Sequence, residues 1–94
     1  MPPLEIEFSP RFRSQARALT DVRQQELAEA VAQLRETFGR PHVHAGLGVR
    51  RLVGSLFEFR IGRDLRVVFE LNKGCASLLL LGNHNDVQRF IKNR

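Results

Sequence analysis

The stretch FEFRIGRDLRVVFEL (residues 57–71) most constrains the fold, because polar and apolar residues alternate in both of its halves. Alternate residues of a strand share a face, so each half presents one apolar face. The two apolar faces coincide only when Ile61 pairs with Leu65, which makes GRD a three-residue loop. The pattern therefore predicts an antiparallel hairpin in which Arg60 lies directly opposite Arg66 on the polar face.

The position of these two arginines suggests a function. A two-residue loop would place Arg66 opposite Phe59 and bury a guanidinium in the core, which is costly. In the predicted register two like charges face each other, and such a pair destabilises a sheet. An anion that bridges them removes that cost, and arginine binds phosphate through two parallel hydrogen bonds. The other interpretation is a solvated lattice of ion pairs in which Glu58 and Glu70 neutralise the arginines.

The first part of the chain has the pattern of a strand followed by two helices. LEIEF (residues 4–8) alternates as a half-buried strand does, and the Ser9-Pro10 pair that follows is typical of a helix N-terminus. A second helix is predicted to begin at Thr20 or Asp21 and to end near Phe38, before a glycine and a proline. Its apolar stripe is Leu27, Val31, Leu34 and Phe38.

Strand patterns return after residues 40–48, which have no clear period and are expected to form a loop. Four strands are predicted, at residues 50–53, 55–61, 65–71 and 76–82, and a short amphipathic helix at residues 83–94. We therefore expect one α+β domain over residues 1–94. It has an N-terminal strand, a two-helix hairpin, an antiparallel β-meander that forms one sheet with the helices packed on one face, and a short C-terminal helix.

Positive charge is concentrated in the second half of the chain. Residues 1–39 contain five arginines and six acidic residues, whereas residues 40–94 contain eight arginines and two lysines against four acidic residues. Such a distribution is typical of proteins that bind nucleic acid or an acidic partner. A G+C-rich genome would explain arginine in place of lysine, but it would not explain the concentration in one half.

Three histidines and one cysteine are the other candidate reactive residues. His84 follows the last strand, which can bring imidazole, a side chain that transfers protons near neutral pH, to the edge of the arginine face. A surface or capping role is the alternative for this single histidine. His42 and His44 have the spacing of metal ligands but no third ligand, so we predict no metal site. Cys75 has no base partner in the sequence and is expected to lie in the core.

Other observations exclude whole classes of protein. No run of about 18 apolar residues is present, and the N-terminus lacks the basic start and apolar stretch of a signal peptide. The single cysteine agrees with a reducing compartment. No P-loop, dinucleotide-binding fingerprint or serine-nucleophile motif occurs. We therefore expect a cytoplasmic protein that does not associate with membranes.

The order and spacing of several short motifs resemble the RelE/ParE superfamily of toxins from bacterial type II toxin–antitoxin systems. The resemblance runs from IEFSPRFRSQARAL to HNDVQRFIK and includes FEFR, DLRVVFEL and LGNHNDV. Through the RelE, YoeB and YafQ branches, it implies an endoribonuclease that cleaves mRNA on translating ribosomes without a metal or another cofactor. The 2′-hydroxyl of the RNA would attack the adjacent phosphate and leave a 2′,3′-cyclic phosphate.

The resemblance also implies roles for single residues. Arg60 matches a basic residue of the hairpin, Arg66 matches the arginine that contacts the scissile phosphate, and His84 matches the C-terminal histidine of YoeB-like members. These three are the expected catalytic residues. Glu58 lies at a position that is often basic in RelE, and it is a candidate base. The residues expected to bind RNA are Arg50, Arg51, Arg63, Arg89 and Lys92.

Partners and alternatives follow from the same resemblance. An acidic cognate antitoxin is expected in every case, with mRNA and the ribosome as further partners of a nuclease. The ParE branch has the same fold but inhibits DNA gyrase, and a toxin fold without chemistry would only bind its antitoxin. Gln88 lies near the position of a tyrosine in many members, so Phe90 is left as the aromatic residue that could stack on a base.

Overall fold

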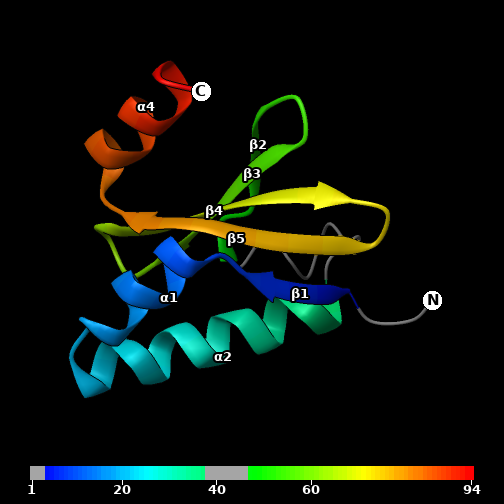
Figure 1. Ribbon diagram of the computed structural model, residues 1–94. Coiled ribbons are helices and arrows are strands. Elements are labelled where there is room, and N and C mark those ends of the chain that lie inside the picture. The colour runs from blue at the N-terminus through cyan, green and yellow to red at the C-terminus, as the bar shows by residue number, and fades with distance from the viewer. Residues whose placement is uncertain (1–3, 38–46) are drawn as a thin grey trace.

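The computed structural model describes residues 4–37 and 47–94, and these ranges contain three helices and five strands (Figure 1). The elements are β1 (Glu5–Phe8), α1 (Pro10–Arg17), α2 (Asp21–Thr37), β2 (Arg50–Val53), β3 (Leu56–Ile61), β4 (Leu65–Asn72), β5 (Cys75–Gly82) and α4 (His84–Lys92). The predicted α+β class and the predicted order of elements are confirmed. Most of the expected loop, together with Phe38, His42 and His44, lies outside the described residues.

Side-chain caps determine where the first two helices begin. The Ser9 hydroxyl accepts a hydrogen bond from the Phe12 N–H at 3.1 Å, and Pro10 occupies the first helical position, where its missing N–H does no harm. The Thr20 hydroxyl accepts from the Arg23 N–H at 3.2 Å at the start of α2. Both helix starts agree with the sequence prediction.

The five strands form one sheet in the order β1-β5-β4-β3-β2. Strands β2 to β5 make the predicted antiparallel meander, and β1 pairs in parallel with β5. The first and second strands therefore lie at opposite edges, and the chain crosses between them through α1 and α2 (Figure 1). A tight turn cannot join strands at opposite edges of a five-stranded sheet, so the connection from β1 to β2 has to be this long.

The register of the central hairpin is the predicted one. Ile61 pairs with Leu65, and Arg60 pairs with Arg66. Residues 62–64 form the connecting turn, as the match of apolar faces required.

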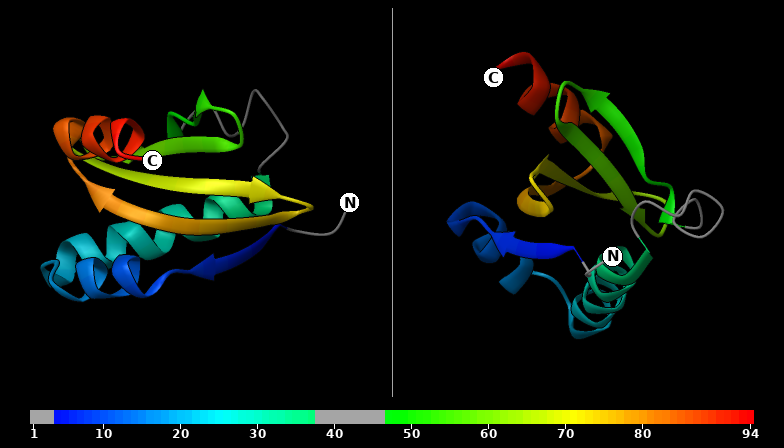
Figure 2. Two further views of the ribbon diagram at one scale, coloured as in Figure 1. Left: turned by 45° about the horizontal axis from the view of Figure 1, so that its top comes forward. Right: turned by 90° about the vertical axis from the view of Figure 1, so that its right-hand side faces the viewer.

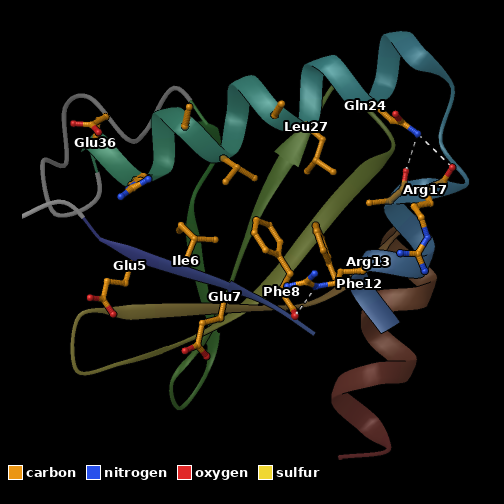
Figure 3. Close-up of a pocket in the computed structure, with 15 residues that line it drawn as sticks. Glu5, Ile6, Glu7, Phe8, Phe12, Arg13, Arg17, Gln24, Leu27 and Glu36 are labelled. Carbon is orange, nitrogen blue, oxygen red and sulfur yellow. Dashed lines mark hydrogen bonds between the residues drawn. The ribbon is translucent and has the colours of Figure 1, made fainter. Parts of the chain in front are cut away.

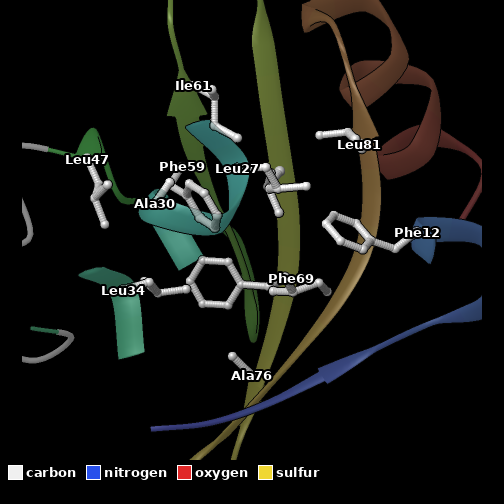
Figure 4. Packing of buried hydrophobic residues seen from close by; sticks show 12 residues of the cluster. Phe12, Leu27, Ala30, Leu34, Leu47, Phe59, Ile61, Phe69, Ala76 and Leu81 are labelled. Carbon is white, nitrogen blue, oxygen red and sulfur yellow. The ribbon is translucent and has the colours of Figure 1, made fainter. Parts of the chain in front are cut away.

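The two faces of the sheet are covered by different helices. Helices α1 and α2 lie on one face and α4 lies on the other, as the left view of Figure 2 shows. The face toward α1 and α2 is apolar, with Phe59, Val67 and Phe69 fully buried in it (Figure 4). This face is the main core, and the prediction that the helix hairpin packs on one face is confirmed.

The face toward α4 has a smaller apolar cluster. Its buried members are Leu56, Val68, Leu80 and Val87, with Leu52, Phe90 and Ile91 packed at its edge. A β-bulge at Leu79 lets Leu80 face this cluster while Leu78 and Leu81 face the main core. The predicted amphipathic side of the C-terminal helix therefore has a partner of its own. No helix of the described ranges is long and apolar enough to span a membrane.

Candidate functional site

A small cleft lies on the α4 face of the sheet, beside the apolar cluster. Its volume is about 290 Å³, and its lining residues are Gly48, Arg50, Glu58, Arg60, Arg66 and His84. We call it the arginine cleft. All three predicted catalytic residues line it, and so do the candidate base and one of the five predicted RNA-binding residues. The sequence therefore located the cleft, although the roles of its residues stay predictions.

Glu58 is the buried centre of the arginine cleft. Its Oε2 atom accepts a hydrogen bond from the Nη1 of Arg66 at 2.7 Å and from the Nε of Arg50 at 2.8 Å. The Glu58 side chain is 2% exposed and that of Arg66 only 17%, whereas the side chain of Arg50 is 58% exposed. The alternative interpretation, a solvated lattice of ion pairs, is therefore wrong for Glu58, whose carboxylate is buried. Helix α4 covers the adjacent part of this face, where Val87 packs against Val68 and Leu80.

Arg60 lies across the sheet from Arg66 but in a different environment. Its side chain is exposed, and it has no ion-pair partner among the described residues. The guanidinium rests against Gly48, where a Cβ atom would lie 3.0 Å from the Nε of Arg60. Gly48 has a φ of +68°, which a larger residue adopts only with strain. In the cleft, therefore, Arg66 is held by its ion pair with Glu58, and Arg60 is available to bind a ligand.

His84 reaches the cleft because of the way in which α4 starts. It is the first residue of α4, two residues after Gly82, which pairs with Arg66 in the sheet. Asn83 and Asp86 form a capping box, in which each side chain accepts a hydrogen bond at 2.8 Å from the other's backbone N–H. A Cβ at Gly82 would lie 2.6 Å from the Asp86 carboxylate, so glycine allows the first turn to pack this closely.

The other predicted RNA-binding residues lie outside the cleft. Arg51 pairs with Phe57 on the opposite face of the sheet and donates to the Gly54 carbonyl at 2.8 Å. Arg63 lies in the exposed turn between β3 and β4. On α4, Arg89 forms an ion pair with Asp86, and Lys92 is exposed at the end of the helix.

No aromatic residue within the described ranges lines the arginine cleft. Phe90 lies instead at a second cleft, of about 430 Å³, between α1 and α4. The guanidinium carbons of Arg11 and Arg94 lie 5.9 and 6.0 Å from the centre of its ring. Phe90 is therefore occupied in packing and in cation–π contacts, and it is not placed to stack on a base in the arginine cleft.

A groove of about 1,020 Å³ lies on the other side of the sheet from the arginine cleft, between β1, α1 and α2 (Figure 3). Two of its polar side chains, Gln24 and Arg13, already have structural partners. The Gln24 amide donates to the carbonyls of Ala16, Arg17 and Leu19, and Arg13 donates to the Phe8 carbonyl. Convergent, available polar groups mark a chemical site, so the smaller arginine cleft is the better candidate.

The remaining candidate residues offer little for chemistry. Burial, followed by the charge of Glu7, raises the pKa of the Cys75 thiol, so the thiol stays protonated at neutral pH. Cys75 is only partly buried, at the start of β5, rather than a core residue as expected. No group of three metal-ligating side chains occurs in residues 4–37 and 47–94.

The composition of the cleft suits an anion next to a proton-transferring group. Three guanidiniums face one carboxylate, so positive charge remains after the ion pairs are formed. The volume lies near the lower limit of small-molecule sites, which is about 300 Å³. We therefore consider one phosphodiester group, not a whole nucleotide, to be the unit that fits.

Comparison with known proteins supports the fold. No protein-family model matches the sequence, and no curated protein is significantly similar to it. Several solved structures resemble the chain over most of its length, among them three that each have 18% sequence identity to it. The toxin of the archaeal RelE-RelB complex from Pyrococcus horikoshii has a TM-score of 0.71, with 86% of this chain and 94% of that chain covered. For the E. coli DinJ-YafQ toxin-antitoxin complex the TM-score is 0.68, with 90% of this chain and 97% of that chain covered. For the YoeB-YefM complex from Staphylococcus aureus the TM-score is 0.61, with 86% of this chain and 97% of that chain covered. The fold implied by the sequence resemblance, that of the RelE, YafQ and YoeB proteins, is thus confirmed.

Proposed function

We propose that this protein is the toxin of a type II toxin–antitoxin system and acts as an mRNA endoribonuclease. The observation that carries the proposal is the arginine cleft. In a fold shared with RelE, YafQ and YoeB, it brings His84, the first residue of α4, together with Arg60 and Arg66 of the β3–β4 hairpin. It has an arginine without an ion-pair partner among the described residues beside a histidine, a combination that the groove between β1, α1 and α2 and the cleft between α1 and α4 lack.

The proposed reaction is an internal phosphoryl transfer. The 2′-oxygen of the RNA forms a bond to the adjacent phosphorus while the bond from phosphorus to the 5′-oxygen breaks, which leaves a 2′,3′-cyclic phosphate. Arg60 and Arg66 bind the phosphate and stabilise the negative charge that increases in the pentacoordinate transition state. One proton leaves the 2′-hydroxyl and one is added to the departing 5′-oxygen. His84, exposed at the rim of the cleft, carries out one of these two transfers.

The proposal includes partners and a place of action. An acidic antitoxin is the expected inhibitor, because the second half of this chain is basic and the structural neighbours include complexes with antitoxins. The RNA substrate is mRNA on translating ribosomes in the cytoplasm. Arg50 contacts the RNA within the cleft, and Arg51, Arg63, Arg89 and Lys92 contact it outside the cleft. These outer contacts contribute affinity that decreases with salt concentration.

Expression of the wild-type chain, followed by analysis of mRNA ends, tests the proposal. We expect translation to stop and messenger fragments with 2′,3′-cyclic phosphate ends to accumulate. His84→Gln should lower the cleavage rate about 10² to 10⁴-fold, the usual contribution of a positioned proton-transfer group. Arg60→Ala should lower it about 10² to 10³-fold, as expected for lost charge stabilisation. Both residues are exposed, so thermal melting should show folded variants.

Matched variants make the result interpretable. Arg35→Ala changes an exposed arginine on α2, on the other side of the sheet, and His42→Ala and His44→Ala change the two remaining histidines; all three should keep most of the cleavage. A His84→Gln variant as active as wild type would contradict the assignment of His84. If the wild type itself produces no cleaved mRNA, the nuclease proposal is wrong. DNA supercoiling by gyrase then becomes the assay that separates a gyrase inhibitor from a protein that only binds its antitoxin.

A further inference from the structure

Glu58 has one carboxylate oxygen that the described residues leave unused. Both arginine contacts are made to Oε2, whereas Oε1 is buried and has no hydrogen-bond partner in the structure. Glu58 is the one charged residue that is buried in residues 4–37 and 47–94. Buried polar atoms nearly always have partners, so an exception in a candidate site calls for an explanation.

The arrangement explains why the second oxygen is left over. Arg66 on β4 and Arg50 on β2 approach the same oxygen from the two strands that flank Glu58. Leaving a buried carboxylate oxygen without a donor costs free energy, and this cost is recovered when a donor arrives. Phosphate oxygens only accept hydrogen bonds when ionised, so a bare phosphate cannot satisfy Oε1. A ligand that does so must carry a hydroxyl or amine next to its anionic group.

We propose that Oε1 of Glu58 accepts a hydrogen bond from the ribose 2′-hydroxyl next to the phosphate that the arginines bind. The inference rests on the proposed function and makes it more specific, because it assigns to Glu58 the distinction between RNA and DNA. A ribonucleotide carries the donor and the anionic group side by side. A deoxyribonucleotide offers the same anion without the donor, and it leaves Oε1 as it is in the free protein.

Access to Oε1 requires a local rearrangement, since the atom is covered in the free protein. Arg50 and Arg66 are held by their ion pairs to Glu58. Arg60 is exposed and has no ion-pair partner among the described residues, so it can move when a phosphate binds. In this proposal, the Arg60 side chain moves to contact the bound phosphate, and the 2′-hydroxyl then reaches Oε1.

Equilibrium binding of matched oligonucleotides tests the inference. The protein carries His84→Gln so that the RNA stays intact, and gel analysis after each titration verifies this. The ligands are a short single-stranded RNA and the 2′-fluoro RNA of the same sequence, which keeps a ribose-like sugar conformation but has no 2′ donor. We expect the RNA to bind about tenfold more tightly or better, as for other hydrogen bonds to a charged group. Adding Glu58→Gln, which puts an amide in place of the carboxylate, should reduce this ratio to about twofold or less.

Two further variants exclude trivial explanations. Glu70→Gln removes a carboxylate from β4 outside the cleft, so it should keep the full RNA preference. Glu58→Met removes both polar atoms, and it tests the same point if the amide forms a new hydrogen bond to the hydroxyl. Thermal melting identifies which of the two Glu58 variants is folded and can be interpreted.

Five results would overturn the inference or separate it from the proposed function. Equal affinity of the parent protein for both oligonucleotides, or a preference that survives both Glu58 variants, overturns the inference. A preference lost equally in Glu70→Gln also overturns it, because the effect would then be one of net charge. If the preference depends on Glu58 but no mRNA is cleaved, ribose recognition stands and the nuclease function fails. If mRNA is cleaved but the preference does not depend on Glu58, the nuclease function stands and ribose recognition by Glu58 fails.

Discussion

The two faces of the sheet are built on different principles, although they share the same five strands. The face toward α1 and α2 is filled by apolar side chains, with Phe59 of β3 beside Phe69 of β4 (Figure 4). The face toward α4 is apolar only where that helix covers it, and beside the helix it contains a buried ion pair and the arginine cleft. The core face stabilises the fold, and this stability offsets the free-energy cost of holding charged groups in place on the other face.

The difference shows how a small domain can carry a charged site. A buried carboxylate is costly unless it is paired, and even paired it seldom stabilises a protein. Glu58 is therefore not explained by stability. It holds Arg66 and Arg50 in fixed positions, while the opposite face supplies the free energy of folding. We expect substitutions on the two faces to differ in kind: those in the core should change stability, and those in the cleft should change function.

The largest effect on stability should come from the core face. Phe59 is fully buried, and Phe59→Ala should lower the free energy of unfolding by about 3–5 kcal/mol, because it removes a large side chain and leaves a cavity. Urea unfolding measures this change. Phe8→Ala is the matched control. Phe8 is 39% exposed on the edge strand, so this substitution should lower the free energy of unfolding by only about 1 kcal/mol. Equal losses in both variants would contradict the close packing of this face.

The core face could be predicted almost completely from the sequence. Alternation in β3 and β4 gave the hairpin register, and Ser9 and Thr20 gave the helix starts, because these signals are local. The parallel pairing of β1 with β5 was not predictable, since no local pattern records which strand lies beside another. The bulge at Leu79 was hidden as well, because four consecutive leucines have no visible period.

The second prediction compares the two arginines that face each other across the hairpin. Arg66→Gln should lower the free energy of unfolding by about 1–3 kcal/mol, because it removes one partner of the buried Glu58 carboxylate. Arg60→Gln should stay within about 1 kcal/mol of wild type, or stabilise slightly, since it removes a like charge opposite Arg66 and breaks no ion pair among the described residues. Urea unfolding of both variants gives the difference. If the two variants lose the same amount, then the ion pair of Arg66 adds nothing to the fold.

This asymmetry marks the limit of prediction for the site. The sequence placed Arg60 and Arg66 opposite each other on the polar face, which is confirmed, but it did not show that the side chain of Arg66 is only 17% exposed there. A signal was present in the sequence. Leu56, Val68 and Leu80 place apolar side chains on the supposedly polar face, and the amphipathic C-terminal helix needed a surface to pack on. Combining these apolar residues with the amphipathic C-terminal helix would have predicted that α4 covers this face and that Glu58 is buried beside it.

The smallest effect should come from the other ion pair of the same face. Glu70 accepts a hydrogen bond from Arg94 at 2.9 Å, but both side chains are well exposed, at 37% and 44%. Water screens such a pair, so Glu70→Gln should change the free energy of unfolding by less than about 1 kcal/mol, and the change should shrink further at high salt. Urea unfolding at low and high ionic strength measures both effects. Glu58 and Glu70 are side chains of the same type on adjacent strands, so coverage by α4 and the arginines is what distinguishes them. A loss at Glu70 as large as the loss in Arg66→Gln would show that burial is not the cause, and the contrast between the charged cleft and its surroundings would have to be abandoned.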